Sequence, residues 1–268
     1  MIRVIKNRGG SMNNKRFSLT MFVLTMIFFY LPLVVLVVYS FNAGKGLTWT
    51  GFSGVWYEEL FNNSDRLWQS FRYSIVIALA SAGLSTMIGT LGAIAIHWYN
   101  FKHKKYLKLI SYLPLVLPDI IMGVSLLIMF STINFKLGLT SIFLAHTTFN
   151  IPFVLFIVLS RLHEFDFSIV EAAYDLGATE WEALTKVILP TLKPGIISGF
   201  LMAVTLSLDD FVITFFVAGP GSSTLPLHIY SMIKFGVSPV INALSVILIA
   251  GTVGLALSTK KIQKYMIN

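Results

Sequence analysis

Three aspartates lie inside long apolar stretches of this 268-residue sequence: Asp119, Asp209 and Asp210. Asp119 follows the run LPLVLP, and the other two interrupt TLSLDDFVITFF. A charged side chain at the centre of a bilayer costs about 2.5–3.5 kcal/mol on insertion scales, so such residues are functional candidates by default. The same stretches hold no lysine or arginine that could neutralise them. Unpaired carboxylates facing a water-filled cavity suit a positively charged passenger, and we expect the three acids to line its path.

A structural role is the competing interpretation for these acids. Pro114 and Pro118 precede Asp119, and prolines free backbone groups that a carboxylate can cap or bond. Both interpretations stay open for Asp119. Asp209 and Asp210 are neighbours, and adjacent residues on a helix diverge by about 100°. We therefore expect only one of this pair to point squarely into a cavity.

The composition is typical of an integral membrane protein. Hydrophobic residues make up 56% of the chain and charged residues only 12%, with a mean hydropathy of +0.78. A soluble domain carries about 25% charged residues. The net charge of +8 then reflects topology and contacts with anionic lipid, and nucleic acid is not an expected partner. The absence of cysteine excludes disulfides, thiolate metal sites and a cysteine nucleophile.

Six apolar runs are each long enough to cross a bilayer, which predicts an all-α polytopic membrane protein with six transmembrane helices. The expected spans are 19–40, 70–97, 108–131, 138–160, 195–217 and 240–259. Fifteen of the twenty lysines and arginines fall on the side of the two termini, so both termini are predicted to be cytoplasmic. The first run lacks a small-residue cleavage site, so we expect a retained helix rather than a signal peptide.

This topology divides the chain into a membrane domain and two short tails. We expect cytoplasmic tails at 1–18 and 260–268 and a permease-like membrane domain at 19–259. A polar cytoplasmic loop, 161–194, separates the fourth and fifth spans and contains SIVEAAYDLGATEWEALTKVILP. The plasma membrane is the expected location.

The polar loop carries signals for two short helices. Ser168 with Glu171, and Thr179 with Glu182, have the spacing of capping boxes. Gly177 lies where a helix C-cap glycine would be, and Pro190 is expected to end the second helix. These signals predict a helix at 169–176, a sharp turn at Gly177 and a helix at 180–189. An amphipathic hairpin that packs on its own bundle would explain the pattern without any partner.

The spacing in this loop is more specific than amphipathicity. Glu171-Ala172-Ala173, three residues, Gly177, nine residues and then Val187-Ile188-Leu189-Pro190 resembles the EAA loop of ABC-importer permeases, with Val187 replacing the usual isoleucine. The resemblance implies a fold like that of type I ABC importer permeases. It also implies that the loop docks on a separate ATPase subunit and couples that subunit's closure to the spans. The residues to which this coupling role is transferred are Glu171, Ala172, Ala173, Gly177, Leu189 and Pro190.

The chain has no phosphate-binding loop of the form G-x-x-x-x-G-K-[ST]. We therefore expect no enzymatic activity and no cofactor, with ATP bound by a partner ATPase that works as a dimer. The resemblance further implies a second permease subunit and an external substrate-binding protein.

A longer resemblance concerns the substrate. The stretch 207–239, with LPDIIMGVSLL and HTTFNIPFV, looks like the C-type permeases of bacterial spermidine/putrescine importers. It runs from the first span to the sixth and leaves out the first 18 residues, where Met12 is an alternative start. Polyamines are cations, so the resemblance and the aspartates point to the same substrate class, although the aspartates belong to the resembling stretches.

Other functions stay open at this point. Within the same class, the passenger could instead be iron, thiamine or a phosphonate, although an anion would call for basic groups where the aspartates lie. A self-sufficient secondary transporter would show an inverted repeat, and it would not need the EAA-like loop. No serine–histidine or HExxH constellation supports an intramembrane enzyme. The five histidines are scattered without metal-ligand spacing, so no metal site is expected.

Overall fold

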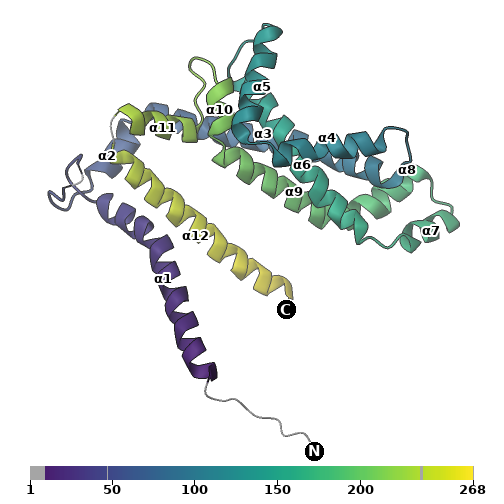
Figure 1. The fold of residues 1–268 in the computed structure, drawn as a ribbon, viewed down its shortest axis with the longest axis horizontal. Helices are drawn as coiled ribbons and strands as arrows, with labels where there is room; N and C mark the ends of the chain where they lie inside the picture. The colour runs from purple at the N-terminus through teal and green to yellow at the C-terminus, as the bar shows by residue number, and fades with distance from the viewer. Residues whose placement is uncertain (1–9, 47, 236–237, 268) are drawn as a thin grey trace, which may run out of the picture. The chain divides into compact units, whose positions relative to one another are not determined.

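The computed structural model describes residues 10–46, 48–235 and 238–267. In the first helix, side chains are described from residue 15 onward, and in the last helix they are described up to residue 254. Within these residues the fold is helical, with one isolated antiparallel bridge between Asn42 and Phe52 (Figure 1). The chain divides into two compact units. Unit one comprises 1–65 and 232–268, and unit two comprises 66–231.

Unit one is built from α1 (Gly10–Tyr39), α2 (Val55–Asn62) and α12 (Val240–Ile267). The helix α12 packs against both α1 and α2. The side chain of Asn42 organises the segment between α1 and α2, because its Oδ1 accepts from the Thr50 amide at 2.8 Å and its Nδ2 donates to the Thr48 carbonyl at 2.9 Å. The Trp56 indole donates to the Asn42 carbonyl at 2.6 Å, which ties this segment to α2.

The remaining elements belong to unit two, although the last of them crosses the boundary between residues 231 and 232. They are α3 (Asp65–Trp98), α4 (Lys104–Val116), α5 (Asp119–Thr132), α6 (Leu139–His163), α7 (Ser168–Asp175), α8 (Glu180–Glu182), the π-helix η1 (Ala183–Ile188), α9 (Leu189–Asp209), α10 (Val212–Val217) and α11 (Leu225–Phe235). The helices α6 and α9 pack along each other, and α5 packs against α10. Small residues allow this closeness: a Cβ on Gly199 of α9 would lie 3.1 Å from the Val154 side chain of α6.

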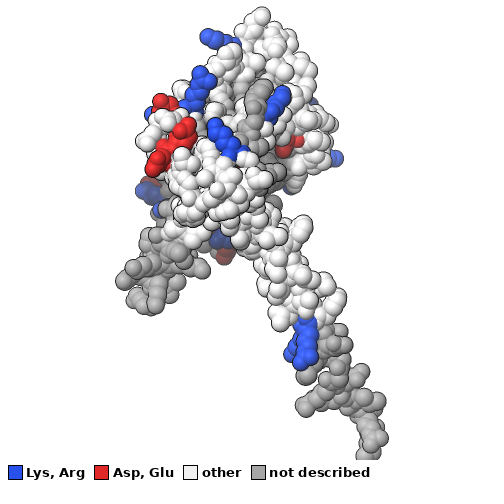
Figure 2. All heavy atoms as spheres, turned by 90° about the vertical axis from the view of Figure 1, so that its left-hand side faces the viewer, with Lys and Arg blue, Asp and Glu red and all other residues white. Residues whose placement is uncertain are grey.

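Four helices are long and apolar enough to cross a membrane: Lys15–Tyr39, Asp65–Trp98, Leu139–His163 and Glu180–Asp209. A fifth span results if α4 and α5 are counted together, and the described part of the last apolar helix, Val240–Gly254, is shorter. The surface agrees with this composition, because few charged side chains interrupt the uncharged face in Figure 2. The count of six spans remains a prediction.

Two of the expected spans are not continuous helices. The run 108–131 is broken between α4 and α5, which are bent by 112° relative to each other. The run 195–217 is broken between α9 and α10. Hydropathy reports how apolar a segment is and not whether its helix is continuous, so the apolar runs alone do not locate these breaks.

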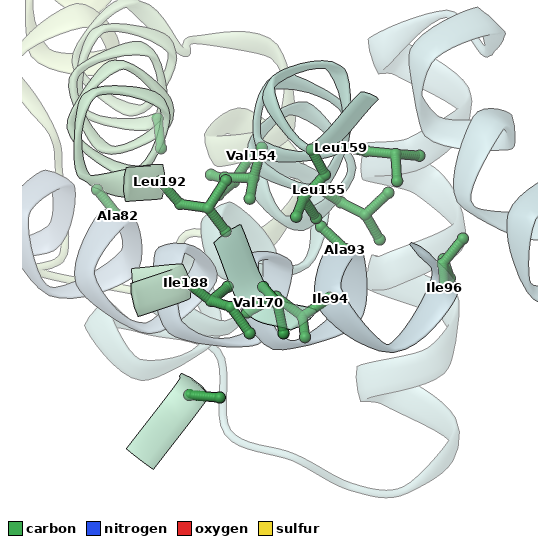
Figure 3. Close-up of a cluster of buried hydrophobic side chains, with 14 residues drawn as sticks. Ala82, Ala93, Ile94, Ile96, Val154, Leu155, Leu159, Val170, Ile188 and Leu192 are labelled. Atoms are coloured by element: carbon green, nitrogen blue, oxygen red, sulfur yellow. The ribbon is translucent and has the colours of Figure 1, made fainter. Parts of the chain in front are cut away.

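Two hydrophobic clusters hold unit two together. One joins α3, α5, α6 and α10 around Ile77, Leu126, Ile142 and Ile213. The other joins the C-terminal half of α3 to α6, α7, η1 and α9 (Figure 3). The first cluster surrounds the helix breaks and the second fixes the polar loop, so each supports one of the two sites predicted from the sequence.

Candidate functional site

The break between α4 and α5 places the first aspartate. Leu117 at the end of α4 has extended backbone angles (φ −71°, ψ 137°), and Pro118 has no N–H to continue the helix. Asp119 is therefore the first residue of α5, and its side chain is exposed. A carboxylate in the first turn is favoured by the partial positive charge of the helix N-terminus, so Asp119 combines a favourable position in α5 with access to the surface.

The break between α9 and α10 determines the positions of the other two aspartates. Asp209 is the last residue of α9, and Asp210 has extended angles (φ −66°, ψ 121°). The Asp210 carboxylate accepts from the amides of Ile213 at 3.2 Å and Thr214 at 2.8 Å. These amides belong to the first turn of α10 and have no partner within that helix, so Asp210 caps it.

The two breaks meet at one cavity of about 370 Å³. Its size falls within the range of about 300–1,000 Å³ typical of small-molecule sites. The lining residues are Pro114, Asp119, Met122, Phe149, Phe153, Leu206, Asp209, Asp210, Phe211, Val212 and Ile213. Three carboxylates and three phenylalanine rings thus surround the cavity, and its described lining includes no lysine or arginine. Carboxylates and aromatic faces both attract cations.

The structure separates the roles of the three acids. Asp119 and Asp209 are exposed at the cavity, whereas the Asp210 side chain is only 7% exposed. The two neighbouring aspartates thus differ in exposure, although both line the cavity. The expectation that all three carboxylates are unpaired was wrong for Asp210, because His146 and Thr214 bind it.

A buried polar network stands behind Asp210. Nε2 of His146, on α6, lies 3.1 Å from Asp210 Oδ2 and 2.9 Å from Thr214 Oγ1. Its Nδ1 lies 2.6 Å from Ser207 Oγ on α9, and the Ser81 hydroxyl of α3 donates to Ser207 at 3.3 Å. The His146 side chain is fully buried. Sequence analysis missed His146, Ser207 and Thr214, although an ionisable histidine inside an apolar span is itself a functional signal.

The polar loop forms the expected helix–turn–helix, with two corrections at its ends. The helix α7 ends at Asp175, and Gly177 adopts φ +85°, a conformation that favours glycine. The capping box at Thr179 is confirmed: its Oγ1 accepts from the Glu182 amide at 3.3 Å, and Glu182 Oε2 accepts from the Thr179 amide at 3.1 Å. The box at Ser168 was wrong, because Asp166 Oδ1 accepts from the Ser168 amide instead, at 3.0 Å.

The second helix of the loop does not end at Pro190. The helix α8 continues through η1 into α9, with Pro190 in the first turn of α9. Proline is tolerated there because the π-helix shifts the local hydrogen-bond pattern, so the missing N–H costs little. The expected stop was wrong, and the consequence is an uninterrupted helical connection from the loop to the cavity at Asp209.

The loop has an anchored side and an outward side. Val170 of α7 and Ile188 of η1 are buried, and Figure 3 shows both beside Ile94 of α3. In contrast, Leu176 is 90% exposed and Trp181 is 72% exposed. The loop therefore packs on its own bundle, as the simpler interpretation expects, and still presents large apolar side chains outward.

The residues of the EAA-like pattern occupy different parts of this loop. Glu171 and Ala172 are exposed on α7, Ala173 is half-buried, and Gly177 forms the turn. Leu189 and Pro190 begin α9. None of these six residues lies in the cavity with the aspartates, and α9 links the two sites.

Acidic groups of the loop are held ionised by local hydrogen bonds. The amide of Ser168 lowers the pKa of Asp166. The pKa of Glu182 falls to about 2, chiefly through its hydrogen bond with Lys186 and then through those with Thr179. Both groups therefore stay negative throughout the physiological pH range.

The family model for "binding-protein-dependent transport system inner membrane component" matches residues 85–266. The chain is 41% identical over 238 residues to the spermidine/putrescine transport system permease protein PotC of Escherichia coli K12, which covers 88% of this chain and 90% of that protein. It is 42% identical over 241 residues to the putrescine transport system permease protein PotI of the same strain, covering 87% and 85%.

A solved structure shares the fold. A chain of a bacterial ABC transporter involved in the import of the acidic polysaccharide alginate superposes with a TM-score of 0.69, covering 95% of this chain and 98% of that one. The two sequences are 14% identical, so this likeness concerns the fold alone. It confirms the expected architecture of an ABC importer permease.

Proposed function

Because the chain belongs to the family of binding-protein-dependent transport system inner membrane components, we propose that it is the permease subunit of an ATP-driven importer of polyamines. The relatives named for spermidine and putrescine transport match it over almost nine-tenths of its length. The observation that carries the substrate class is the cavity at the two helix breaks, where Asp119, Asp209 and Asp210 meet.

The cavity has the chemistry that a linear polyamine requires. Its described lining provides carboxylates for ammonium groups and the rings of Phe149, Phe153 and Phe211 for the methylene chain and for cation–π contacts. The N-termini of α5 and α10 carry partial positive charge at this point, which would repel a cation. The aspartates outweigh these partial charges, so the site favours a cation over an anion.

The loop with α7, Gly177 and α8 is the proposed contact with the ATPase. Leu176 and Trp181 supply exposed apolar area for a partner groove, and Glu171 is exposed for pairing with a basic group. The uninterrupted helix from α8 through η1 to Asp209 supports this role, since a rigid connection passes on a displacement that a flexible loop would absorb.

The remaining subunits of the proposed importer are a dimeric cytoplasmic ATPase, which binds the ATP, a second permease and an external binding protein. This chain acts as a non-enzymatic subunit, and the positive-inside distribution of lysine and arginine favours both termini in the cytoplasm.

Uptake of labelled spermidine and putrescine tests the proposal. Cells that lack their own polyamine importer would express the ATPase, second permease and binding protein encoded with this chain, with or without the chain itself. We expect uptake only in its presence, and competition by unlabelled putrescine but not by an anionic solute. ATP-dependent transport of a different solute would refute the polyamine assignment, and uptake by this chain alone would refute the ABC importer assignment.

A further inference from the structure

His146 is the one histidine of the described chain whose two ring nitrogens both contact side chains of the cavity region. It lies on α6, is fully buried, and contacts Ser207 of α9 and both Asp210 and Thr214 at the α9–α10 break. A buried histidine that served only to fill space would contact apolar groups. Here the ring joins two transmembrane helices to the residue that caps α10.

The hydrogen bonds of the network fix the position of the imidazole proton. Asp210 Oδ2 accepts from the Thr214 amide at 2.8 Å and from the Thr214 hydroxyl at 2.7 Å. An ionised carboxylate only accepts, so the facing His146 Nε2 must carry a hydrogen. Ser207 can then donate its hydroxyl to Nδ1, while its oxygen accepts from Ser81. Every member is satisfied with a neutral imidazole protonated on Nε2.

This arrangement leaves the charge of Asp210 available. A neutral His146 holds the carboxylate without cancelling its charge. Three donors occupy Oδ2, whereas the described partner of Oδ1 is the Ile213 amide at 3.2 Å. Oδ1 therefore keeps spare acceptor capacity at a residue that lines the cavity.

We propose that His146 is a positioning residue for substrate passage: as a neutral Nε2–H donor, it fixes Asp210 at the α9–α10 break so that a full negative charge faces the cavity. The proposal rests on the proposed polyamine function and adds to it the group that sets the charge of the site.

Three substitutions of His146 distinguish its role as a hydrogen-bond donor to Asp210 from a role in filling space. The amide nitrogen of His146→Gln extends about as far as Nε2 and can donate to Asp210 without titrating. The shorter His146→Asn reaches Ser207 and not Asp210. His146→Phe fills the space with no donor at all. His163→Gln, at an exposed position near the polar loop, is the matched control.

The complete complex, reconstituted in lipid nanodiscs with its binding protein, would be assayed for spermidine-stimulated ATP hydrolysis at pH 8. We expect the Phe and Asn variants to assemble and to lose stimulation by about tenfold or more, the size expected for a lost hydrogen bond to a charged group. The Gln variant should stay within about threefold of wild type at pH 8.

Rescue by the conservative variant is the readout that a merely structural histidine would not give. His146→Gln keeps a donor at the position of Nε2, so its half-maximal spermidine concentration should stay near that of wild type and His163→Gln. His146→Asn and His146→Phe lack a donor to Asp210, so both should raise that concentration.

The outcomes distinguish this inference from the proposed function. A wild-type complex that spermidine does not stimulate would overturn the proposed function and the inference with it. A stimulated wild type together with a His146→Gln variant as impaired as His146→Phe would overturn the inference alone. Equal activity of the Gln, Asn and Phe variants would do the same, and failure of all three to assemble would assign His146 to folding.

Discussion

Asp209 and Asp210 are adjacent in sequence and differ in what surrounds them. Asp210 is 7% exposed and accepts four hydrogen bonds, while Asp209 is exposed at the cavity with no hydrogen-bond or ion-pair partner among the described residues. The two carboxylates therefore do different work: Asp210 both shapes the break and contributes charge, and Asp209 contributes charge alone.

Substituting Asp209 should therefore impair transport and leave the protein intact. We expect Asp209→Asn to reduce polyamine uptake by about tenfold or more, because a charge-assisted hydrogen bond is worth about 1.5–3 kcal/mol. Complex assembly, measured by co-purification with the ATPase, should be unchanged. Asp209→Glu, which keeps the charge, is the control and should retain more uptake than the Asn variant. Assembly that collapses in Asp209→Asn would instead make this acid structural.

Substitutions at Gly177 test whether the turn of the polar loop is needed for ATPase coupling. Its φ of +85° is strained for alanine, although a Cβ there would meet no atom within 4 Å. The left-handed conformation costs an L-residue about 1–2 kcal/mol, and asparagine tolerates it better. We expect Gly177→Ala to weaken ATPase coupling, measured as transport per ATP hydrolysed, and Gly177→Asn to weaken it less. Equal coupling in wild type and both variants would show that the turn geometry is not required.

At the scale of elements, the cavity depends on the close packing of α5 on α10. A Cβ on Gly123 of α5 would lie 2.7 Å from Cδ2 of Phe216 and 3.3 Å from Cα of Ile213. A methyl group there forces α10 away from α5, and α10 carries the amides that Asp210 caps. Overpacking of this kind typically costs about 1–3 kcal/mol.

We accordingly expect Gly123→Ala to lower the thermal stability of the purified complex and to reduce uptake. Gly83→Ala is the matched control, since its Cβ would meet nothing within 4 Å and its position on α3 is exposed. Thermal unfolding followed by intrinsic fluorescence would compare the two. A Gly83 variant that is destabilised as much as the Gly123 variant would contradict the packing argument.

Local sequence signals predicted the elements better than their connections. The Thr179–Glu182 box formed because both partners lie within one turn. The Ser168 box failed because Asp166, two residues earlier, competes for the same amide. The Gly177 turn was predictable from glycine alone, whereas Pro190 misled, since a proline stop assumes an α-helix and the structure places a π-helix before it.

The candidate site was only half visible in the sequence. Its acids stand out because they interrupt apolar runs, and hydropathy finds such residues readily. Their partner does not stand out: His146 lies 64 residues from Asp210, and only the packing of α6 against α9 brings the two together. Hydropathy averages over a whole span and does not show the helix breaks. Pro118 gave a sequence signal for the first break, and no proline marks the second.

At the scale of the whole molecule, the membrane topology can be tested without background, because the chain has no cysteine. Asn62 lies between the first and second predicted spans, which cytoplasmic termini place outside the cell, so we expect Asn62→Cys to react with a membrane-impermeant maleimide on intact cells. Leu176→Cys, 90% exposed in the polar loop, should react only after the cells are permeabilised. Labelling of Leu176→Cys in intact cells would reverse the predicted orientation and remove the loop from reach of a cytoplasmic ATPase.

His146 precedes Asp210 in the sequence, so the ribosome makes the histidine before the aspartate that it binds. Synthesis runs from the N-terminus, so α6 is made before the α9–α10 segment. The donor His146 therefore already exists when Asp210, 64 residues later, is made. If the order in the chain were reversed, the acid would be made first and its donor would follow 64 residues later. The carboxylate would then have no such donor until the later segment was made.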